Sequence, residues 1–261
     1  MPAPSIQFQS VDILKRYLLA VILALGLFAS LLLSVVNVPG LAQWDASLAA
    51  VVQGLRSDGT DRLMVVLTML GDLSLALWMV ATVIAGLLCL RRWWLALHLL
   101  CVGLSAMLSV SLIKSILARA RPDVPSITLD SFSFPSGHAC TAAVTWGLVA
   151  LILAYGRRPR QRCLIHAAGF VMASAVAISR VYLHVHWPSD VIAGMALGYG
   201  LLTAFAWQLH TAPVLRLPTF ARLLAFCSAI TAIHVLGNYP GQATLYSIAS
   251  RHASIELHAD R

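Results

Sequence analysis

Charged residues are scarce in this chain. Only 11% of its 261 residues are Asp, Glu, Lys or Arg, whereas 59% are hydrophobic and the mean hydropathy is +0.83. A soluble globular protein of this length has about twice as large a charged share, so the composition excludes an ordinary soluble protein. The sequence also lacks a linker rich in Pro, Gly or Ser, a low-complexity tract and an internal repeat, which indicates one domain embedded in a bilayer.

Cysteine and acidic residues are also few. The five cysteines lie in apolar runs, are odd in number and show no CxxC spacing, so neither a disulfide framework nor a zinc knuckle is indicated. The net charge is +8, but Lys and Arg are scattered at the ends of apolar runs and do not follow one face. We therefore expect no nucleic-acid partner and attribute the basic residues to membrane topology.

Long apolar runs are abundant, and about 20 such residues cross a bilayer as a helix. The sequence predicts an all-α, polytopic transmembrane bundle with a cytoplasmic segment 1–16, a six-span domain 17–209 and a C-terminal extension 210–261. The extension contains a possible seventh helix over 220–237. A further stretch, 41–55, has apolar residues at near-helical spacing, typical of an interfacial helix or of ordinary packing. The six predicted spans are 17–37, 63–90, 94–118, 138–155, 163–181 and 189–209.

The first run is preceded by Lys15 and Arg16 and could be a signal peptide, but it is longer than such a segment usually is, so we expect a retained anchor. With a cytoplasmic N-terminus, the larger group of basic residues falls on the cytoplasmic side, as the positive-inside rule requires. That group is Lys15, Arg16, Arg91, Arg92, Arg157, Arg158, Arg160, Arg162, Arg216 and Arg222. Excluding three motif cations, the other side holds Arg56, Arg62, Arg119, Arg251 and Arg261.

Three polar loops then face outward together, although they are far apart in sequence. The first follows the third span, where Lys114 and Arg121 lie about two helical turns apart and Pro122 ends the helix. Alone, these two cations are typical of side chains that reach from a helix end towards the membrane surface. Helix counting nevertheless predicts that this loop meets the other two.

The second loop, Phe134 to His138, opens an apolar helix. There the free backbone N–H groups, the Ser136 hydroxyl and the positive helix end favour an anion, and Gly137 permits close approach of a ligand. Ser136 also fits a plain N-cap.

The third loop lies between the fifth and sixth spans and contains Arg180, His184, His186 and Asp190. Ionisable side chains are costly near hydrocarbon, so their gathering at one membrane surface requires a common reason. Three cations, Lys114, Arg121 and Arg180, beside two histidines indicate a site for phosphate or another tetrahedral oxyanion.

Together, Lys-x6-Arg-Pro, Pro-Ser-Gly-His and Ser-Arg-x5-His-x3-Asp, in this order, resemble the three-part signature of the type 2 phosphatidic acid phosphatase superfamily. The motifs cover Lys114 to Asp190, and the layout of spans extends the resemblance over 17–209. The residues after 210 have no counterpart that the resemblance assigns.

The resemblance implies a phosphohistidine mechanism. His186 would attack phosphorus, Asp190 would orient its imidazole, and His138 would protonate the leaving lipid oxygen and then activate water. The groups implied to hold the nonbridging oxygens are Lys114, Arg121, Ser136, Gly137 and Arg180. No metal and no cofactor is then required.

Several histidines remain outside this scheme. His184 stands where the family often has a small residue, and its role stays open. A metal site of His138, His184, His186 and Asp190 is an alternative, but its spacing fits no common zinc motif and nearby cations oppose it. Four other histidines have no charged partner nearby in sequence and are predicted to be structural: His98, His166, His210 and His234.

The expected substrate is a lipid phosphate in the membrane, with undecaprenyl diphosphate favoured because recycled carrier is exposed on the outer face. Phosphatases of lipid A, phosphatidylglycerophosphate or phosphatidate, and a lipid phosphotransferase, stay open, as does a transporter or non-enzymatic binder of anionic headgroups. The related vanadium haloperoxidases share the oxyanion site, but soluble enzymes of that kind lack six apolar spans. We expect a bacterial inner-membrane protein whose site faces the periplasm; the sequence predicts no oligomeric state.

Overall fold

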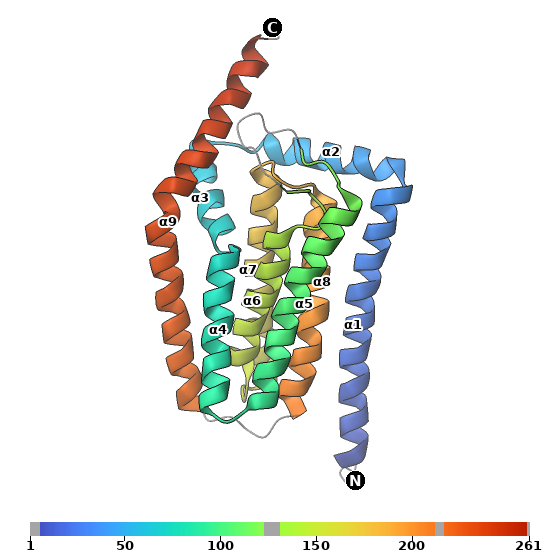
Figure 1. The fold of residues 1–261 in the computed structure, drawn as a ribbon, viewed down its shortest axis with the longest axis vertical. Coiled ribbons are helices and arrows are strands. Elements are labelled where there is room, and N and C mark those ends of the chain that lie inside the picture. Colours follow the sequence, from blue (N-terminus) through green and yellow to red (C-terminus); the bar gives the residue numbers. More distant parts are fainter. Residues whose placement is uncertain (1–5, 123–130, 212–216, 260–261) are drawn as a thin grey trace.

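The computed structural model describes residues 6–122, 131–211 and 217–259, with side chains placed within 14–122, 131–211 and 225–246. These ranges form nine helices and no strand, so the predicted all-α fold is confirmed (Figure 1). The helices are α1 (Ile6–Asn37), α2 (Pro39–Gln53), α3 (Asp58–Met69), α4 (Leu73–Cys89), α5 (Trp93–Leu117), α6 (Gly137–Ala154), α7 (Pro159–Tyr182), α8 (Pro188–Thr211) and α9 (Leu217–Ala259).

Five helices are long and apolar enough to cross a membrane, namely α1, α5, α6, α7 and α8. A sixth span is formed if α3 and α4 are taken together, because this bent pair also passes the same test. The structure thus has five candidate spans, or six when the bent pair is counted as one, against the six that were predicted. Within its described residues, α9 does not pass that test of length and hydropathy.

The second predicted span, 63–90, is not one continuous helix. It is broken between Met69 and Leu73, where α3 and α4 meet at an angle of 41°. The carbonyl oxygens of Leu70 and Gly71, which lose their helical partners there, accept hydrogen bonds from Trp146 Nε1 at 3.0 Å and Thr141 Oγ1 at 2.7 Å. Side chains of α6 thus satisfy the broken backbone, which allows Asp72 to begin α4 within a membrane protein.

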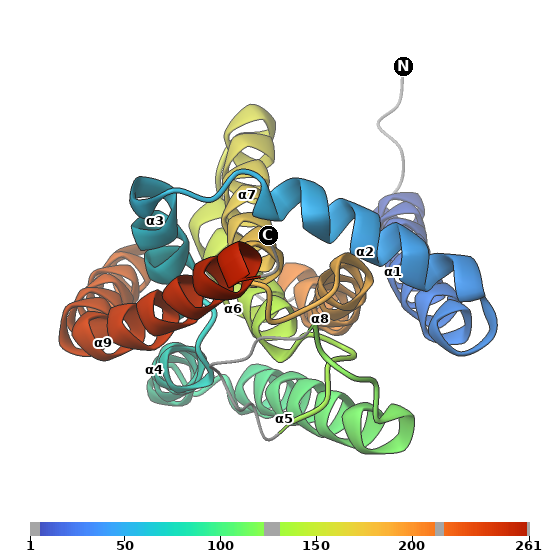
Figure 2. The ribbon, with the colours of Figure 1, turned by 90° about the horizontal axis from the view of Figure 1, so that it is seen from above.

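Helix α6 lies at the centre of the bundle and contacts α4, α5, α7, α8 and α9 (Figure 2). Its close packing with α8 depends on Gly194 and Gly198. A Cβ atom at these positions would lie 2.4 Å from the Ser136 oxygen and 2.6 Å from the Cys140 oxygen. Small residues four positions apart let two membrane helices approach closely, so the start of α6 is held beside the start of α8.

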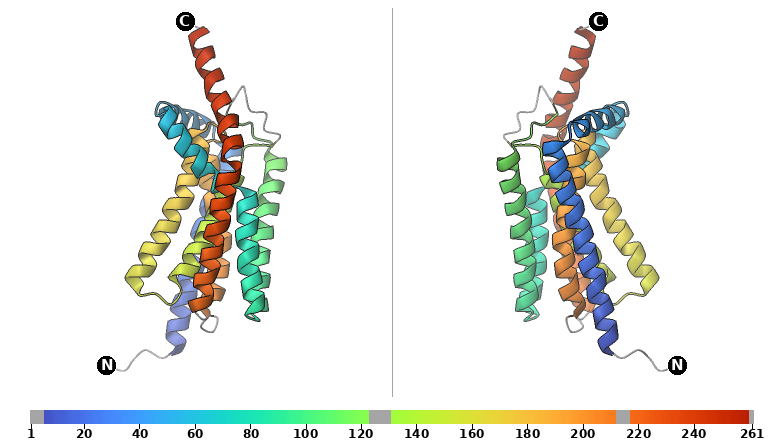
Figure 3. Two further views of the ribbon diagram at one scale, coloured as in Figure 1. Left: turned by 90° about the vertical axis from the view of Figure 1, so that its left-hand side faces the viewer. Right: turned by 90° about the vertical axis from the view of Figure 1, so that its right-hand side faces the viewer.

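Three helices complete the bundle from outside. Helix α2, which covers most of the stretch 41–55, lies across one end of it, while α1 and α9 run along opposite flanks (Figures 1 and 3). The N-terminal end of α1 is at the end of the bundle that is remote from α2. The three motif loops lie at the α2 end, so the prediction that they share one surface is confirmed.

The helix predicted over 220–237 is much longer than expected and extends over Leu217–Ala259. Pro240 follows the predicted range, and proline disfavours a helix because it removes an N–H donor and clashes with the preceding turn. In the structure Pro240 lies inside α9, which contacts α3 and α4 and continues past this residue. Contacts with these neighbours, which no local pattern reveals, override the helix-breaking residue.

Candidate active site

A cavity of about 310 Å³ opens where the three motif loops meet. Most of the sequence-predicted site residues line it: Lys114, Arg121, Gly137, His138, Arg180 and His186. Ser136 and Asp190 do not line it but lie directly behind it, and both are fully buried. The structure therefore brings all eight predicted residues into one region, with six at the cavity wall.

His186 lies in the short loop between α7 and α8 and is only 2% exposed. Its Nδ1 is 3.4 Å from Asp190 Oδ2, and its Nε2 is 3.2 Å from the Arg121 guanidinium. This arrangement fits a neutral ring with the proton on Nδ1 and a lone pair on Nε2. Burial, together with Arg180, Arg121 and Lys114, holds the pKa of His186 well below its ordinary value. The ring is therefore neutral, and nucleophilic, at neutral pH.

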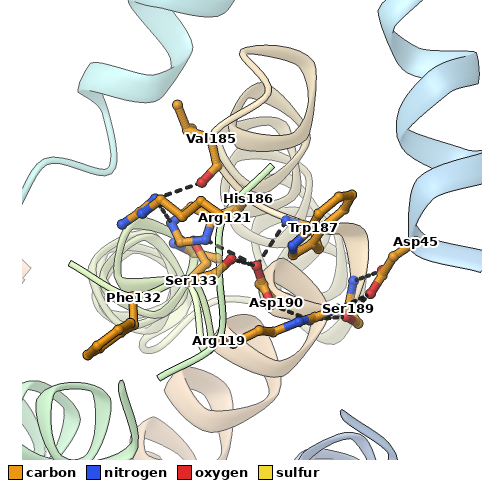
Figure 4. A network of polar contacts seen from close by, with 12 residues as sticks. Asp45, Arg119, Arg121, Phe132, Ser133, Val185, His186, Trp187, Ser189 and Asp190 are labelled. Atoms are coloured by element: carbon orange, nitrogen blue, oxygen red, sulfur yellow. Dashed lines mark hydrogen bonds and ion pairs between the residues drawn. The ribbon is translucent and has the colours of Figure 1, made fainter. Parts of the chain in front are cut away.

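Asp190 is held by more partners than His186 alone (Figure 4). Its Oδ2 accepts hydrogen bonds from the Trp187 backbone N–H at 2.9 Å and from the Ser133 hydroxyl, while its Oδ1 pairs with Arg119 at 2.6 Å. These contacts fix the carboxylate at the first turn of α8, where the helix dipole also favours a negative charge. His186 thus faces an acceptor that cannot rotate freely.

Arg119 and Asp45 were not predicted as part of the site. Arg119 bridges Asp190 and Asp45 with two contacts of 2.6 Å, and Asp45 also accepts hydrogen bonds from the Ser189 N–H and hydroxyl (Figure 4). Asp45 comes from α2 and is completely buried. A buried ion pair therefore holds α2, which lies across the end of the bundle, against the start of α8, in addition to apolar contacts. Neither residue belongs to a recognisable motif, and only the presence of Asp45 inside an apolar stretch hinted at a role.

The three predicted cations occupy three separate elements and pair with none of the described carboxylates. Lys114, in the last turn of α5, donates to the backbone oxygens of Phe132 and Ser133. Arg121 donates to Ser131 and to the Val185 oxygen. Because each makes hydrogen bonds only with neutral groups, their positive charge stays uncompensated around the cavity.

Arg180 is the most deeply buried of these cations, at 3% exposure. Its terminal NH1 donates to Thr68 Oγ1 at 2.7 Å and to the Tyr246 hydroxyl at 2.9 Å, whereas its Nε has no hydrogen-bond partner among the described residues. A buried guanidinium donor without a partner at a cavity wall is costly unless a ligand accepts from it. The cavity is therefore suited to an anion with several oxygens. Tyr246 shows that α9, which the sequence left unassigned, also reaches this site.

Ser136 caps helix α6, its hydroxyl accepting from the Ala139 N–H at 3.4 Å. This geometry matches the plain N-cap that the sequence allowed. Gly137 starts the helix at the cavity wall, so the free N–H groups of the first turn lie next to the uncompensated cations.

His138, one residue further, lies between the cavity and the α3–α4 break. Its Nε2 is 3.0 Å from Asp72 Oδ1, and the other carboxylate oxygen of Asp72 is 2.9 Å from Nε2 of His234 in α9. His234, which was predicted to be structural because it has no charged partner nearby in sequence, therefore has one in the fold. Its partner is 162 residues away in sequence, in the break of a span that was expected to be continuous. The other three histidines predicted to be structural, His98, His166 and His210, do not line the cavity.

The side chain of His184 does not line the cavity. The residue lies just after the end of helix α7. Its φ is +59°, in the left-handed region, and the N–H groups of His184 and Val185 donate back to the oxygens of Val181 and Arg180. This is a Schellman motif, in which the left-handed position usually holds glycine. Among the described residues, no group of three or more His, Cys, Asp or Glu is arranged to hold a metal ion.

An apolar groove continues from the polar cavity. It lies between α4 and α5, is floored by α6, and is lined by residues such as Ala76, Val80, Gly103 and Leu104. The groove and the cavity share the lining residues Leu73, Ala106, Met107 and Thr141. A ligand with an anionic head and an apolar tail could therefore place its head among the cations and its tail along α4 and α5.

Comparison with known proteins gives consistent matches. A sequence profile described as the PAP2 superfamily matches residues 94–214. The chain is 30% identical over 178 residues to phosphatidylglycerophosphatase B of Bacillus subtilis (strain 168), covering 67% of this chain and 88% of that protein. It is also 45% identical over 67 residues to the undecaprenyl-diphosphatase of Sulfolobus acidocaldarius, covering 26% of this chain and 29% of that protein. The crystal structure of a transmembrane PAP2 type phosphatidylglycerolphosphate phosphatase from Bacillus subtilis is similar, with a TM-score of 0.61 and 26% identity over 80% of this chain and 100% of that chain.

Proposed function

The chain belongs to the PAP2 superfamily of membrane lipid phosphatases, and from this premise we propose that it hydrolyses a phosphate ester of a glycerolipid through a phosphohistidine intermediate. The observation that carries this proposal is the cavity itself. It combines three unpaired cations with a buried, neutral histidine and continues into an apolar groove.

In the first chemical step, the Nε2 lone pair of His186 attacks phosphorus. A nitrogen–phosphorus bond forms as the bond to the lipid oxygen breaks, and His138 gives its proton to that oxygen. Asp190 accepts the Nδ1–H of His186 and stabilises the positive charge that the ring gains. Lys114, Arg121 and Arg180 hold the nonbridging oxygens, together with the first N–H groups of α6.

In the second step, water attacks the phosphohistidine. His138, now neutral, accepts a proton from that water, the nitrogen–phosphorus bond breaks, and inorganic phosphate leaves. Both histidines then return to their starting protonation states, so the cycle balances without a metal or cofactor.

For the substrate we favour phosphatidylglycerophosphate. The support is the Bacillus subtilis phosphatidylglycerophosphatase B, because 88% of that protein aligns with this chain. Undecaprenyl diphosphate, favoured by topology, is retained as a second candidate, since the match to an undecaprenyl-diphosphatase is more identical but spans only 67 residues. We place the site at the periplasmic surface, because Arg91, Arg92, Arg157 and Arg158 belong to the α4–α5 and α6–α7 connections, which lie at the end of the bundle opposite α2 (Figure 1).

The test is phosphate release by the purified protein in detergent with EDTA present. Phosphatidylglycerophosphate, undecaprenyl diphosphate and phosphatidate are compared, using wild type, His186→Ala and the control His98→Ala, whose ring contacts the Trp94 oxygen one turn earlier in α5. We expect EDTA-resistant release that is lost only in His186→Ala. A radiolabelled phosphoenzyme that survives base but not acid would identify the nitrogen–phosphorus bond. Absence of release from every lipid, or full activity of His186→Ala, would contradict the proposal.

A further inference from the structure

Asp72 lies between two histidines, of which only one lines the active-site cavity. The carboxylate oxygens of Asp72 contact Nε2 of His138 at 3.0 Å and Nε2 of His234 at 2.9 Å. The exposed fractions of these side chains are 30% for His138, 18% for Asp72 and 11% for His234. The contacts are thus largely sheltered from solvent, where a charged hydrogen bond is strong and orientation matters.

The geometry defines the protonation pattern of both rings. Each Nε2 faces a carboxylate oxygen, so each ring places its proton on Nε2. On His138 this leaves Nδ1 as the atom that can exchange a proton with a substrate or with water. On His234, Nδ1 is 3.4 Å from the Asn238 amide Nδ2, which is a donor. That contact fits a lone pair on Nδ1, so His234 donates to Asp72 from Nε2.

Helix α9 is anchored to the active site at a second point, which keeps His234 in place. The Tyr246 hydroxyl accepts from Arg180 at 2.9 Å, and the Tyr246 ring packs with Val65, Met69 and Leu183. The family profile ends at residue 214, so both contacts come from a helix outside the matched region.

We propose that His234 is a positioning residue for the reaction: it holds the Asp72 carboxylate in the orientation that favours the protonated ring of His138 and turns that ring towards the leaving oxygen. This inference rests on the proposed function, because it assumes that His138 is the general acid. His234 itself touches neither the substrate nor the reacting atoms.

The charges around His138 give the expected direction. Burial, Arg180 and Arg121 oppose a positive charge on its ring, and Asp72 is the acidic group that favours this charge against them. If His234 cannot donate, Asp72 loses one of its two fixed partners and can turn towards water. The protonated fraction of His138 then falls, so the alkaline limb of the plot of kcat/KM against pH should move to lower pH. Neutralising Asp72 should have the same effect.

The experiment compares two substrates that differ in their need for a general acid. A lipid phosphate releases an alkoxide, which must be protonated, whereas p-nitrophenyl phosphate releases a stable anion that needs no proton. The ratio kcat/KM is measured for both, because it reports steps up to departure of the leaving group. The variants are His234→Ala and His234→Phe, which cannot donate, His234→Gln, which can, and Asp72→Asn. The control is Thr231→Ala, one turn earlier in α9, whose hydroxyl donates to the Cys227 oxygen and to the Met79 sulfur and does not contact Asp72.

We expect His234→Ala and His234→Phe to lower kcat/KM for the lipid phosphate about tenfold, equivalent to about one pH unit in His138 protonation, with p-nitrophenyl phosphate changed less than about twofold. His234→Gln should restore the lipid activity, and Thr231→Ala should match wild type on both substrates. Equal losses on both substrates would assign His234 a purely structural role and overturn the inference. Unchanged lipid activity in both non-donor variants would also overturn the inference. The same holds if His234→Gln loses as much lipid activity as His234→Ala. A wild type that cleaves neither substrate would instead defeat the proposed function, and this is seen before any variant is compared.

Discussion

At the scale of single residues, the cations around His186 have two effects. They bind an anionic substrate, and before it arrives they oppose protonation of the nucleophile, since burial, Arg180, Arg121 and Lys114 all lower the pKa of His186. Arg121 is itself affected, because burial and Arg180 lower its pKa to about 10. It still carries its charge at neutral pH. Before the substrate binds, His186 is therefore in the neutral form that the reaction needs.

This arrangement predicts the acid limb of the pH profile. Because the pKa of His186 is lowered, the ring stays neutral as the pH falls below 6.5, and kcat/KM should decline only at lower pH. Arg121→Gln removes one cause of the lowered pKa, so the acid limb should move upward by roughly half a unit to one unit, alongside a fall in activity. The measurement is kcat/KM against pH for both proteins on one lipid phosphate.

The substrate's own ionisation is the same in both profiles, so the difference between the limbs belongs to the enzyme. Arg158→Gln, at the far end of the bundle, is the matched control for loss of one positive charge. A limb that stays in place in Arg121→Gln, or that moves equally in Arg158→Gln, would show that Arg121 does not govern the protonation of His186.

The residues that the sequence revealed are those whose spacing is local. Lys114 and Arg121 share a helix end, and His186 and Asp190 lie four residues apart across the start of a helix. Asp72, His234 and Asp45 could not be found in this way, because their partners are brought to them by packing of distant helices. Each is a polar residue within an apolar stretch, which marks it as costly to bury but does not name its partner.

At the scale of elements, the end of α7 determines where His186 lies. His184 occupies the left-handed position of a Schellman motif, and the turn that it makes directs the chain towards the cavity, which His186 reaches two residues later. The ring of His184 also meets Trp187 edge to face, with centroids 6.5 Å apart. The conformation of the backbone, rather than an imidazole in the cavity, is what this position requires.

His184→Gly should therefore retain activity within about twofold and raise the free energy of unfolding by up to about 1 kcal/mol, because glycine adopts the left-handed region without a Cβ penalty. His184→Val should lower that free energy by about 2 kcal/mol, because a branched side chain is strained there. Thermal unfolding in detergent and phosphate release check both variants. Loss of activity in the glycine variant with stability intact would instead indicate a chemical role for the His184 ring.

Helix α2 contributes to the site through a single carboxylate. Asp45 is fully buried, and its loss would leave Arg119 and the Ser189 donors without an acceptor. Asp45→Ala should lower the free energy of unfolding by about 3 to 5 kcal/mol, the cost of breaking a buried ion pair from one side. Activity should fall as well, because Arg119 also holds Asp190. Trp44→Ala, an exposed neighbour on the same helix, should change neither quantity appreciably.

Thermal midpoints and kcat of the two variants in the same detergent provide the measurement. If Asp45→Ala and Trp44→Ala were equally mild, α2 would be held by its apolar contacts and the ion pair would be dispensable. Asp45→Asn, which keeps an acceptor oxygen but loses the charge, should fall between wild type and Asp45→Ala.

The helices themselves were largely predictable, since hydropathy over about 20 residues is enough to place a span. The break between α3 and α4 was not, because Leu70, Gly71 and Asp72 form too short an interruption for a hydropathy window to register. Its stability depends on Trp146 and Thr141, which lie in another helix. The length of α9 escaped prediction for the opposite reason, since Pro240 is a local stop signal that packing overrides.

At the scale of the whole molecule, chemistry and lipid binding are separated along the bundle axis. The polar cavity lies at the α2 end, while the apolar groove follows α4 and α5 into the span region. A phosphate in the headgroup layer can thus reach His186 while its chain stays among apolar side chains. The enzyme need not lift the lipid out of the bilayer, which would cost about 0.8 kcal/mol for every exposed methylene.

A side chain that fills the groove should therefore impair only substrates with long chains. Gly103 lines the groove, and a Cβ atom there meets nothing within 4 Å, so Gly103→Leu can be built without a backbone clash. We expect it to raise KM for the lipid phosphate several-fold and to leave hydrolysis of p-nitrophenyl phosphate unchanged. Gly26→Leu is the matched control, because Gly26 also has open space but lies in α1, away from the groove. If both variants behaved alike, or if Gly103→Leu slowed both substrates equally, the lipid chain would have to lie elsewhere on the bundle.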